Sequence, residues 1–563
     1  MLMRLLVSLL LVAAICVAPA GAKKRPRDEL VIGITQFPST FNPLIDSMLA
    51  KSYILAMTRR PMTVYDKDWK LVCLLCTELP TIENGRAVPE ALPPGAATDR
   101  PGGSKGIALR VTIHPEAKWG DGTPVSTRDV VFTWKVGRNP KSGVGNMEAF
   151  RRVLRIDVKD EKTFILHVDR ITFDYNDLAG FDLLPAHLEE KPFADPVEYR
   201  NRTTFDRDPA NRGLYFGPYR ITKVVSGSHV VLERNPTWYG KKPFFRRIVV
   251  RVIQNTAALE ANLRSGGVDY IAGELGLTLD QAVAFEKRNL GKYNVIYKAG
   301  LIYEHLDLNL DNPILKDRRV RQALILGIDR DAISRQLFDG RQPTAHSLVS
   351  PLDWIAWPDV PKYRYDPRRA DALLDAAGWR TRRGGIRHND KGERLTLSLM
   401  TTAGNRSREL VEQVLQSQWR QIGIDVRIRN EPARVFFGQT VTRRKFTGAA
   451  MFAWISSPEN VPRTTLHSSH IPTKANNYSG QNYTGFRNAE MDGLIDRIEV
   501  ELDRTKRRAL WRRLQKIYAT ELPVIPLYFR ANAYIVPKWL KGIEPTGHQY
   551  PSTLWVENWS AQR

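Results

Sequence analysis

The chain has 563 residues, of which 42% are hydrophobic and 26% are charged. These proportions are typical of a globular protein and exclude a disordered or fibrous chain. At about 100–200 residues per domain, the length predicts three or four domains or two large lobes. Lysine and arginine outnumber aspartate and glutamate by 84 to 60, which gives a net charge of +24. These cations are interspersed with acids and form no long basic tail, so we do not expect nucleic-acid binding.

The N-terminus has the three-part layout of a secretory signal peptide. Arg4 precedes the apolar run 5–18, and the small residues 20–22 are followed by three cations. The run is shorter than the roughly 20 residues that a membrane span needs. We therefore expect a signal peptide over residues 1–22, cleavage after Ala22 and a periplasmic protein. Lipid anchoring at Cys16 is not expected, because the bulky Ile15 precedes it.

The predicted elements in the first half of the chain mix strands and helices. Residues 30–34 are typical of a buried strand, and the stretch 84–106, rich in Gly, Pro and Ala, predicts a long loop. Apolar residues alternate with polar ones over 109–113, as in a half-buried strand. Ser126 and Asp129 have the spacing of a capping box, so a helix is expected to begin there.

The second half continues the mixture, which indicates an α/β or α+β architecture. Asp366 followed by Pro367 predicts a helix start, and Gly378 predicts its end. The other expected elements are strands at 230–232, 248–253 and 424–428 and helices over 318–337 and 407–422.

Six groups of residues, in order along the chain, resemble one known family. They are Ala117 to Pro124 with Asp129 to Phe132; Gly217 to Arg220 with Glu233 to Pro236 and Trp238-Tyr239; Asp317 to Leu324 with Ile328 to Arg330 and Gly340; Tyr365 to Ala370 with Leu373-Leu374 and Ala377 to Trp379; Gln421 to Val426; and Asn476-Asn477, Asn488 to Asp492 and Leu522 to Leu527. Most of these are turn and cap residues of a scaffold. Together they resemble the family 5 extracellular solute-binding proteins, the peptide, oligopeptide and nickel binding components of ABC importers.

The resemblance implies an α/β, two-lobed periplasmic binding protein of type II, cluster C, with mixed sheets flanked by helices. Lobe I would comprise residues 23–274, with an extra subdomain over about 60–210. Lobe II would comprise 275–527, and 528–563 would return to lobe I. The two chain crossings would act as hinges, and a ligand would be enclosed in the cleft between the lobes.

The implied function is capture of a peptide or peptide-like ligand by a monomer and its delivery to the membrane subunits of an ABC importer. Three alternatives stay open at this point. They are a binder of another solute such as an oligosaccharide, opine or metal chelate, a secreted enzyme, and a protein associated peripherally with anionic membranes. No catalytic residue, resident metal or cofactor is predicted, because hydrolase, phosphate-binding and Ser-x-x-Lys motifs are absent from the sequence.

In peptide-binding members of the family, a Trp-x-x-Asp segment of lobe II supplies an aspartate to the ammonium group of the ligand. The matching stretch here begins at Trp454, and Ser457 stands where the aspartate would be. This departure argues against recognition of a free amine at that position. Glu459, two residues later, is the alternative carboxylate, and Ser456 and Trp454 are further ligand candidates.

The resemblance places other candidate ligand residues around the cleft. They are Phe37, Phe41, Asn146, Met147, Tyr215, Phe216, Asn477 and Tyr528. His467 and His470 have a spacing that could serve a metal, but neither a cysteine nor a third histidine accompanies them, so a solvated loop is expected. Cys73 and Cys76 have redox-type spacing, yet their context favours a structural disulfide or two buried thiols.

Overall fold

The computed structural model describes residues 28–93, 105–289, 291–476, 478 and 480–562. The predicted signal peptide, its cleavage site after Ala22 and Cys16 lie outside these residues. Within the described ranges, no helix combines the length and the apolar character needed to cross a membrane.

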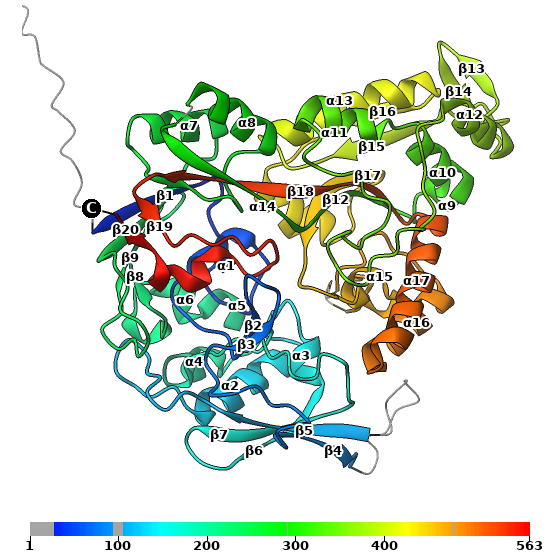
Figure 1. The fold of residues 1–563 in the computed structure, drawn as a ribbon. Helices are drawn as coiled ribbons and strands as arrows, with labels where there is room; N and C mark the ends of the chain where they lie inside the picture. Colours follow the sequence, from blue (N-terminus) through cyan, green and yellow to red (C-terminus); the bar gives the residue numbers. More distant parts are fainter. Residues whose placement is uncertain (1–27, 94–104, 290, 477, 479, 563) are drawn as a thin grey trace, which may run out of the picture.

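Ten strands of the described chain form one sheet that runs through both lobes (Figure 1). Their order is β16-β15-β17-β12-β18-β11-β1-β10-β9-β8. Strand β1 pairs in parallel with β10 and β11, and β15 pairs in parallel with β16 and β17, while the other neighbours are antiparallel. Their bounds are β1 Glu29–Ile34, β8 Tyr219–Val225, β9 His229–Arg234, β10 Arg247–Val252, β11 Tyr270–Ile271, β12 Tyr293–Leu308, β15 Thr396–Met400, β16 Asp425–Ile428, β17 Ala449–Ile455 and β18 Val524–Pro537.

The two long antiparallel strands β12 and β18 join the lobes through the middle of this sheet (Figure 1). Their pairing shifts register between Ala299 and Ile302, where Gly300 lies against the segment that follows β18. A Cβ on Gly300 would lie 2.1 Å from the carbonyl oxygen of Gly547. Glycine is therefore required for this close approach of two backbones.

A separate four-stranded sheet forms the end of the molecule that carries the predicted extra subdomain (Figure 1). Its order is β4-β5-β7-β6, and helices α2, α3 and α4 lie between it and the rest of the protein. The backbone N–H of Ser126 donates to the Asp129 carboxylate at 2.9 Å, which confirms the predicted capping box. The bounds are β4 Ala87–Ala91, β5 Lys105–Thr112, β6 Val153–Val158, β7 Thr163–Val168, α2 Thr127–Arg138, α3 Glu148–Arg151 and α4 Ala186–Phe193.

Two of the expected elements differ from the structure. The stretch 84–106, expected to be a loop, contains strand β4, while its residues 94–104 lie outside the described ones. Strand β4 is at the edge of its sheet, where Pro89, which has no backbone N–H to donate, is tolerated. The single helix expected over 318–337 is two helices, α10 (Arg318–Leu326) and α11 (Arg330–Phe338). The Asp329 side chain accepts a hydrogen bond from the N–H of Ala332 at 2.8 Å and begins the second helix. Aspartate stabilises a helix start better than a helix interior, so the chain breaks there.

The helices expected after Asp366 and around 407–422 are confirmed. The Asp366 side chain accepts from the N–H of Arg369 at 2.9 Å, and the helix is followed by Gly378 at a positive φ of 93°. The remaining helices and strands are α1 Leu49–Leu55, α5 Tyr199–Arg202, α6 Thr204–Arg207, α7 Thr256–Arg264, α8 Leu279–Arg288, α9 Pro313–Lys316, α12 Pro367–Ala376, α13 Arg406–Gln421, α14 Ala433–Val435, α15 Arg463–Leu466, α16 Ala489–Val500, α17 Arg504–Glu521, β2 Thr63–Tyr65, β3 Leu71–Cys73, β13 Thr381–Arg383, β14 Ile386–His388, β19 Leu540–Lys541 and β20 Ser560–Ala561.

Candidate ligand-binding cavity

A cavity of about 230 Å³ lies where the end of the first lobe that carries α3 meets the second lobe. Three parts of the chain contribute its walls. With the lobes taken at their expected bounds, they are the first lobe with Tyr65, Arg152, Phe173, Asp174, Asp177 and Gly180; the second lobe with Ser457, Pro458, Glu459, Asn460, Val461 and Glu499; and the C-terminal return with Gln549 and Tyr550. Because both lobes supply walls, a ligand held here contacts both of them at once.

Phe173 joins the first-lobe wall to the second lobe. Its backbone N–H donates to the carbonyl oxygen of Glu499 on α16 at 2.9 Å. The guanidinium of Arg507 on α17 lies 4.4 Å from the centroid of its ring, a cation–π distance. The N–H of Gln549 also donates to the carbonyl of Ser456 at 3.1 Å. These contacts bring the two lobes together around the cavity.

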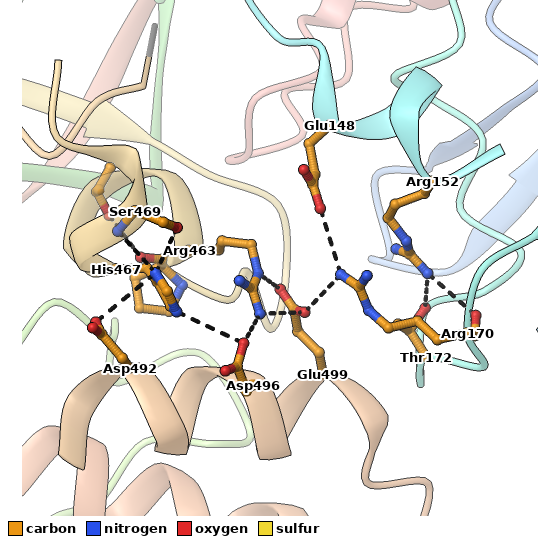
Figure 2. Close-up of polar contacts among 12 residues, drawn as sticks. Glu148, Arg152, Arg170, Thr172, Arg463, His467, Ser469, Asp492, Asp496 and Glu499 are labelled. Atoms are coloured by element: carbon orange, nitrogen blue, oxygen red, sulfur yellow. Dashed lines mark hydrogen bonds and ion pairs between the residues drawn. The ribbon is translucent and has the colours of Figure 1, made fainter. Parts of the chain in front are cut away.

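A chain of ion pairs crosses between the lobes beside the cavity (Figure 2). Arg170 of the first lobe lies 3.5 Å from the carboxylate of Glu148 on α3 and 3.3 Å from that of Glu499 on α16. Glu499 pairs in turn with Arg463 on α15 at 2.5 Å. Arg463 also pairs with Asp496, which belongs to the same helix as Glu499. The chain therefore has one link that connects the lobes, between Arg170 and Glu499.

Two carboxylates of this chain, those of Glu148 and Asp496, are held in their ionised form. Burial alone would raise the pKa of Glu148, but the guanidinium groups of Arg170 and Arg152 hold that pKa below its usual value. Burial opposes ionisation of Asp496 as well, and hydrogen bonds from His467 and Arg463 hold its pKa far below its usual range. The chain of ion pairs thus keeps these charges through the neutral pH range.

Four carboxylates line the cavity, and two of them have cationic partners. Glu459 receives a hydrogen bond from Arg507 at 2.5 Å and one from the indole N–H of Trp354 at 3.0 Å. Glu499 is paired with Arg463 and Arg170, as described above. Glu459, the expected alternative to the missing aspartate, is therefore already paired inside the protein.

The other two carboxylates, Asp174 and Asp177, have no cation within ion-pair distance among the described residues. One oxygen of Asp177 accepts the N–H of Ala179 at 3.0 Å. Burial raises the pKa of Asp177 to about 6, and the charge of Asp174 contributes to the rise. The first-lobe wall of the cavity therefore carries negative charge that the protein itself does not neutralise.

Ser457 lies in the second-lobe wall, where the resemblance placed the departure from the family pattern. It is 8% exposed and brings no charge to the cavity. Trp454 does not line this cavity, since its ring lies in a cluster with Phe452 and Tyr483 at centroid distances of 5.3 and 5.9 Å. Ser456 contributes its backbone carbonyl to the contact with Gln549.

The structure places most of the remaining candidates away from the cavity. Phe41, Tyr215, Phe216 and Tyr528 are buried in the core, Phe37 packs on Phe41, Met147 is buried beside α3, the exposed Asn146 accepts the N–H of Glu148, and Asn477 lies outside the described residues. The contacts of these residues are structural, and a ligand role for them stays a prediction.

The first-lobe and C-terminal walls of the cavity contain no residue that the sequence predicted as a ligand contact. Asp174 and Asp177 belong to the run Phe173-Asp174-Tyr175-Asn176-Asp177, in which aromatic and acidic residues follow a strand. That composition was the available signal for two of the missed residues. Tyr65, Gln549 and Tyr550 carry no local motif and join the site only through the fold.

Neither the cysteine pair nor the two histidines singled out in the sequence line this cavity. Cys73 and Cys76 form a disulfide, which confirms the first of the two structural interpretations of this pair. Among the residues that the structure describes, no group of three or more histidines, cysteines, aspartates or glutamates is arranged to hold a metal ion. His467 instead lies 3.7 Å from the Asp496 carboxylate in the ion-pair cluster of Figure 2.

Comparison with known proteins agrees with this architecture. The family model described as bacterial extracellular solute-binding proteins, family 5 (middle region), matches residues 94–473 of the sequence. The oligopeptide-binding protein AppA of Bacillus subtilis is 26% identical over 533 residues, covering 93% of this chain and 90% of that protein. An oligopeptide-binding protein of Thermus thermophilus, solved with a pentapeptide, is 30% identical with a TM-score of 0.84, covering 95% of this chain and 98% of its own.

A more distant structure shows how widely the fold is shared. NikZ from Campylobacter jejuni, solved with Ni(L-His), has a TM-score of 0.80 at 22% identity and covers 95% of this chain and 100% of its own. These likenesses confirm the expected two-lobed periplasmic binding protein fold. The family match and the similarity to these proteins, together with the cavity between two lobes, show that the chain belongs to family 5 of the bacterial extracellular solute-binding proteins.

Proposed function

We propose that this protein is the binding component of an ABC importer, and that it encloses a peptide between its lobes and delivers it to the membrane subunits. The observation that carries the proposal is the cavity whose walls come from both lobes and from the C-terminal return. The similar proteins from Bacillus subtilis and Thermus thermophilus, both named as oligopeptide-binding, support a peptide as the ligand class.

The proposed mechanism is closure driven by the ligand. A peptide that contacts both walls gains interactions in the closed form that the open form cannot offer, so binding shifts the population toward closure. The register shift in β12 and β18 beside Gly300 supports these strands as the place where the lobes move relative to each other. The closed protein would then be the form that the importer recognises.

Export and the absence of turnover are parts of this proposal. The family is extracellular, and residues 1–22 are expected to direct secretion with cleavage after Ala22. Mass measurement of the mature protein should place its N-terminus at Lys23. A binding protein also returns its peptide unchanged, so chromatography of a peptide after incubation should show no cleavage products.

Native mass spectrometry of the protein purified from its own periplasm tests the ligand class. We expect a bound mass that denaturation releases and that fragmentation identifies as a peptide. Release of a sugar, an opine or a metal chelate would keep the family and the fold but overturn the peptide assignment. For protein that is purified empty, the expected result is a rise in melting temperature with peptides but not with these other solutes.

A further inference from the structure

We infer that this cavity receives a primary ammonium group of the peptide, and that Asp174 and Asp177 of the first lobe are its anionic partners. The inference rests on the proposed function and adds to it the chemical class of the group that is bound. The aspartate of the family pattern would stand at position 457 in the second lobe. The partners inferred here lie instead on the first lobe.

The charge balance of the cavity walls favours a ligand cation. Glu459 is neutralised by an arginine of the second lobe, Arg507. Glu499 is neutralised by Arg463 of the second lobe and by Arg170 of the first. Arg152 is the one cation among the described lining residues. Its guanidinium forms an ion pair with Asp169 at 3.4 Å and donates a hydrogen bond to the Thr172 hydroxyl at 3.2 Å. Two carboxylates therefore remain without a counter-charge in a partly enclosed space. A buried charge without a partner is costly, so a ligand cation is stabilised here and a ligand carboxylate is repelled.

An aromatic wall lies next to these acids. The rings of Tyr65 and Tyr550 stack with their centroids 6.4 Å apart and their planes 25° apart, and both residues line the cavity. The faces of tyrosine rings attract cations, and these rings bring no further formal charge to the cavity. Two acids beside an aromatic wall are a favourable environment for an ammonium group and a poor one for an anion or a plain apolar side chain.

Closure of the lobes would strengthen this interaction. Asp174 and Asp177 lie one and four residues after Phe173, which binds Glu499 and Arg507 of the second lobe. The second-lobe wall opposite them, Ser457 to Val461, closes the cavity without adding a free charge. An ammonium group bound to the two aspartates is thus shielded from water by the lobe contact, which strengthens the attraction in the closed form.

The experiment compares three pools of pentapeptides of mixed sequence by native mass spectrometry and titration calorimetry. The first pool contains no Lys, Arg or His and has free amino termini. The second is the same pool after N-acetylation, and the third is N-acetylated but contains one lysine. The α-ammonium is the only cation in the first pool, and the lysine ammonium is the only one in the third, so the two sources are separated.

Each pool is tested on the wild-type protein and on the Asp174→Asn/Asp177→Asn variant. The matched control is Glu116→Gln/Glu161→Gln, which removes two carboxylates that lie outside the cavity in the same part of the first lobe. Thermal unfolding of all three proteins shows that the folds are comparable before binding is measured.

We expect the wild-type and control proteins to bind peptides with an ammonium group at least tenfold more tightly than the acetylated, lysine-free pool. The double aspartate variant should lose this preference and bind all three pools alike. Equal wild-type affinity for the first two pools, without a gain from lysine in the third, would overturn the inference. So would an unchanged preference in the double variant. If no pool binds the wild-type protein, the peptide proposal fails and the inference falls with it.

Discussion

Replacing Glu499 by glutamine removes the charge that links the lobes and keeps the volume of the side chain. Arg170 would retain Asp169 at 2.8 Å and Glu148, and Arg463 would retain Asp496. No buried cation is left without a carboxylate, so the protein is expected to fold normally. The change therefore acts mainly on the attraction between the lobes, and we expect the closed complex to open and release its ligand faster.

The geometry sets the size of this effect. Two unit charges 3.3 Å apart attract by about 5 kcal/mol at an effective dielectric constant of about 20. Most of this attraction is offset by desolvation and by the competing carboxylates of Glu148 and Asp169 around Arg170. The difference between a charge-assisted and a neutral hydrogen bond leaves about 1–2 kcal/mol. Release of a peptide should therefore be about 5- to 30-fold faster in Glu499→Gln.

Stopped-flow fluorescence with a labelled peptide measures the release rate directly. The matched control is Asp496→Asn, which removes an ion pair inside the second lobe, between α15 and α16. This control should lower the free energy of unfolding without changing the release rate. Faster release in Asp496→Asn to the same extent would show that general destabilisation, and not loss of the lobe contact, explains the result.

Glu499 also lines the cavity, so a direct effect on the ligand must be separated from the effect on closure. A double-mutant cycle with Arg170→Met does this. If Glu499 acts through Arg170, Glu499→Gln should have little further effect in the Arg170→Met background. Release that is accelerated equally in both backgrounds would show that Glu499 acts on the ligand independently of Arg170.

Three further variants test other parts of the structure. Asp177→Asn should stabilise the ligand-free protein by about 1–3 kcal/mol at pH 7, because a carboxyl whose pKa rises from 3.8 when unfolded to about 6 when folded is destabilising while ionised. The wild-type protein recovers this energy as the pH falls from 6 to 4, so urea unfolding at pH 4 should show almost no gain. Lys51→Met should cost about 2–4 kcal/mol in urea unfolding, because four backbone carbonyl oxygens that lie 2.5–3.2 Å from the Lys51 Nζ would lose the donor that they share; unchanged stability would contradict this. Gly300→Ala should lower the melting temperature, since its Cβ would lie 2.1 Å from a backbone oxygen; Gly438→Ala, where a Cβ meets nothing within 4 Å and φ is not positive, is the control for adding a methyl group to a glycine.

The sequence alone was sufficient for features that depend on neighbouring residues. The capping box at Ser126 and Asp129 and the helix start at Asp366 were found because a cap and the backbone N–H that it binds lie within three residues. The spaced motifs identified the family for the same reason, since they are turns and caps of its scaffold. The helix break at Asp329 was missed because apolar periodicity continued across it.

The candidate site depended on contacts that no local pattern records. Ser457 was found because it belongs to a recognisable segment, whereas Glu459 was interpreted as a ligand group and proved to be paired with Arg507. Arg507, the partner of Glu459, lies 48 residues further along the chain. A carboxylate looks the same in the sequence whether it is neutralised or free, and only the surrounding charges decide which it is.

The chain by itself therefore determined the family, the order of many elements and the departure at Ser457. Only the tertiary structure decided that Tyr65, Asp174, Ser457 and Tyr550 surround one cavity. The physical reason is that caps and turns are stabilised by bonds across a few residues, while the cavity is created by the packing of two lobes. Strands β12 and β18 connect these lobes, and their packing joins segments separated by hundreds of residues.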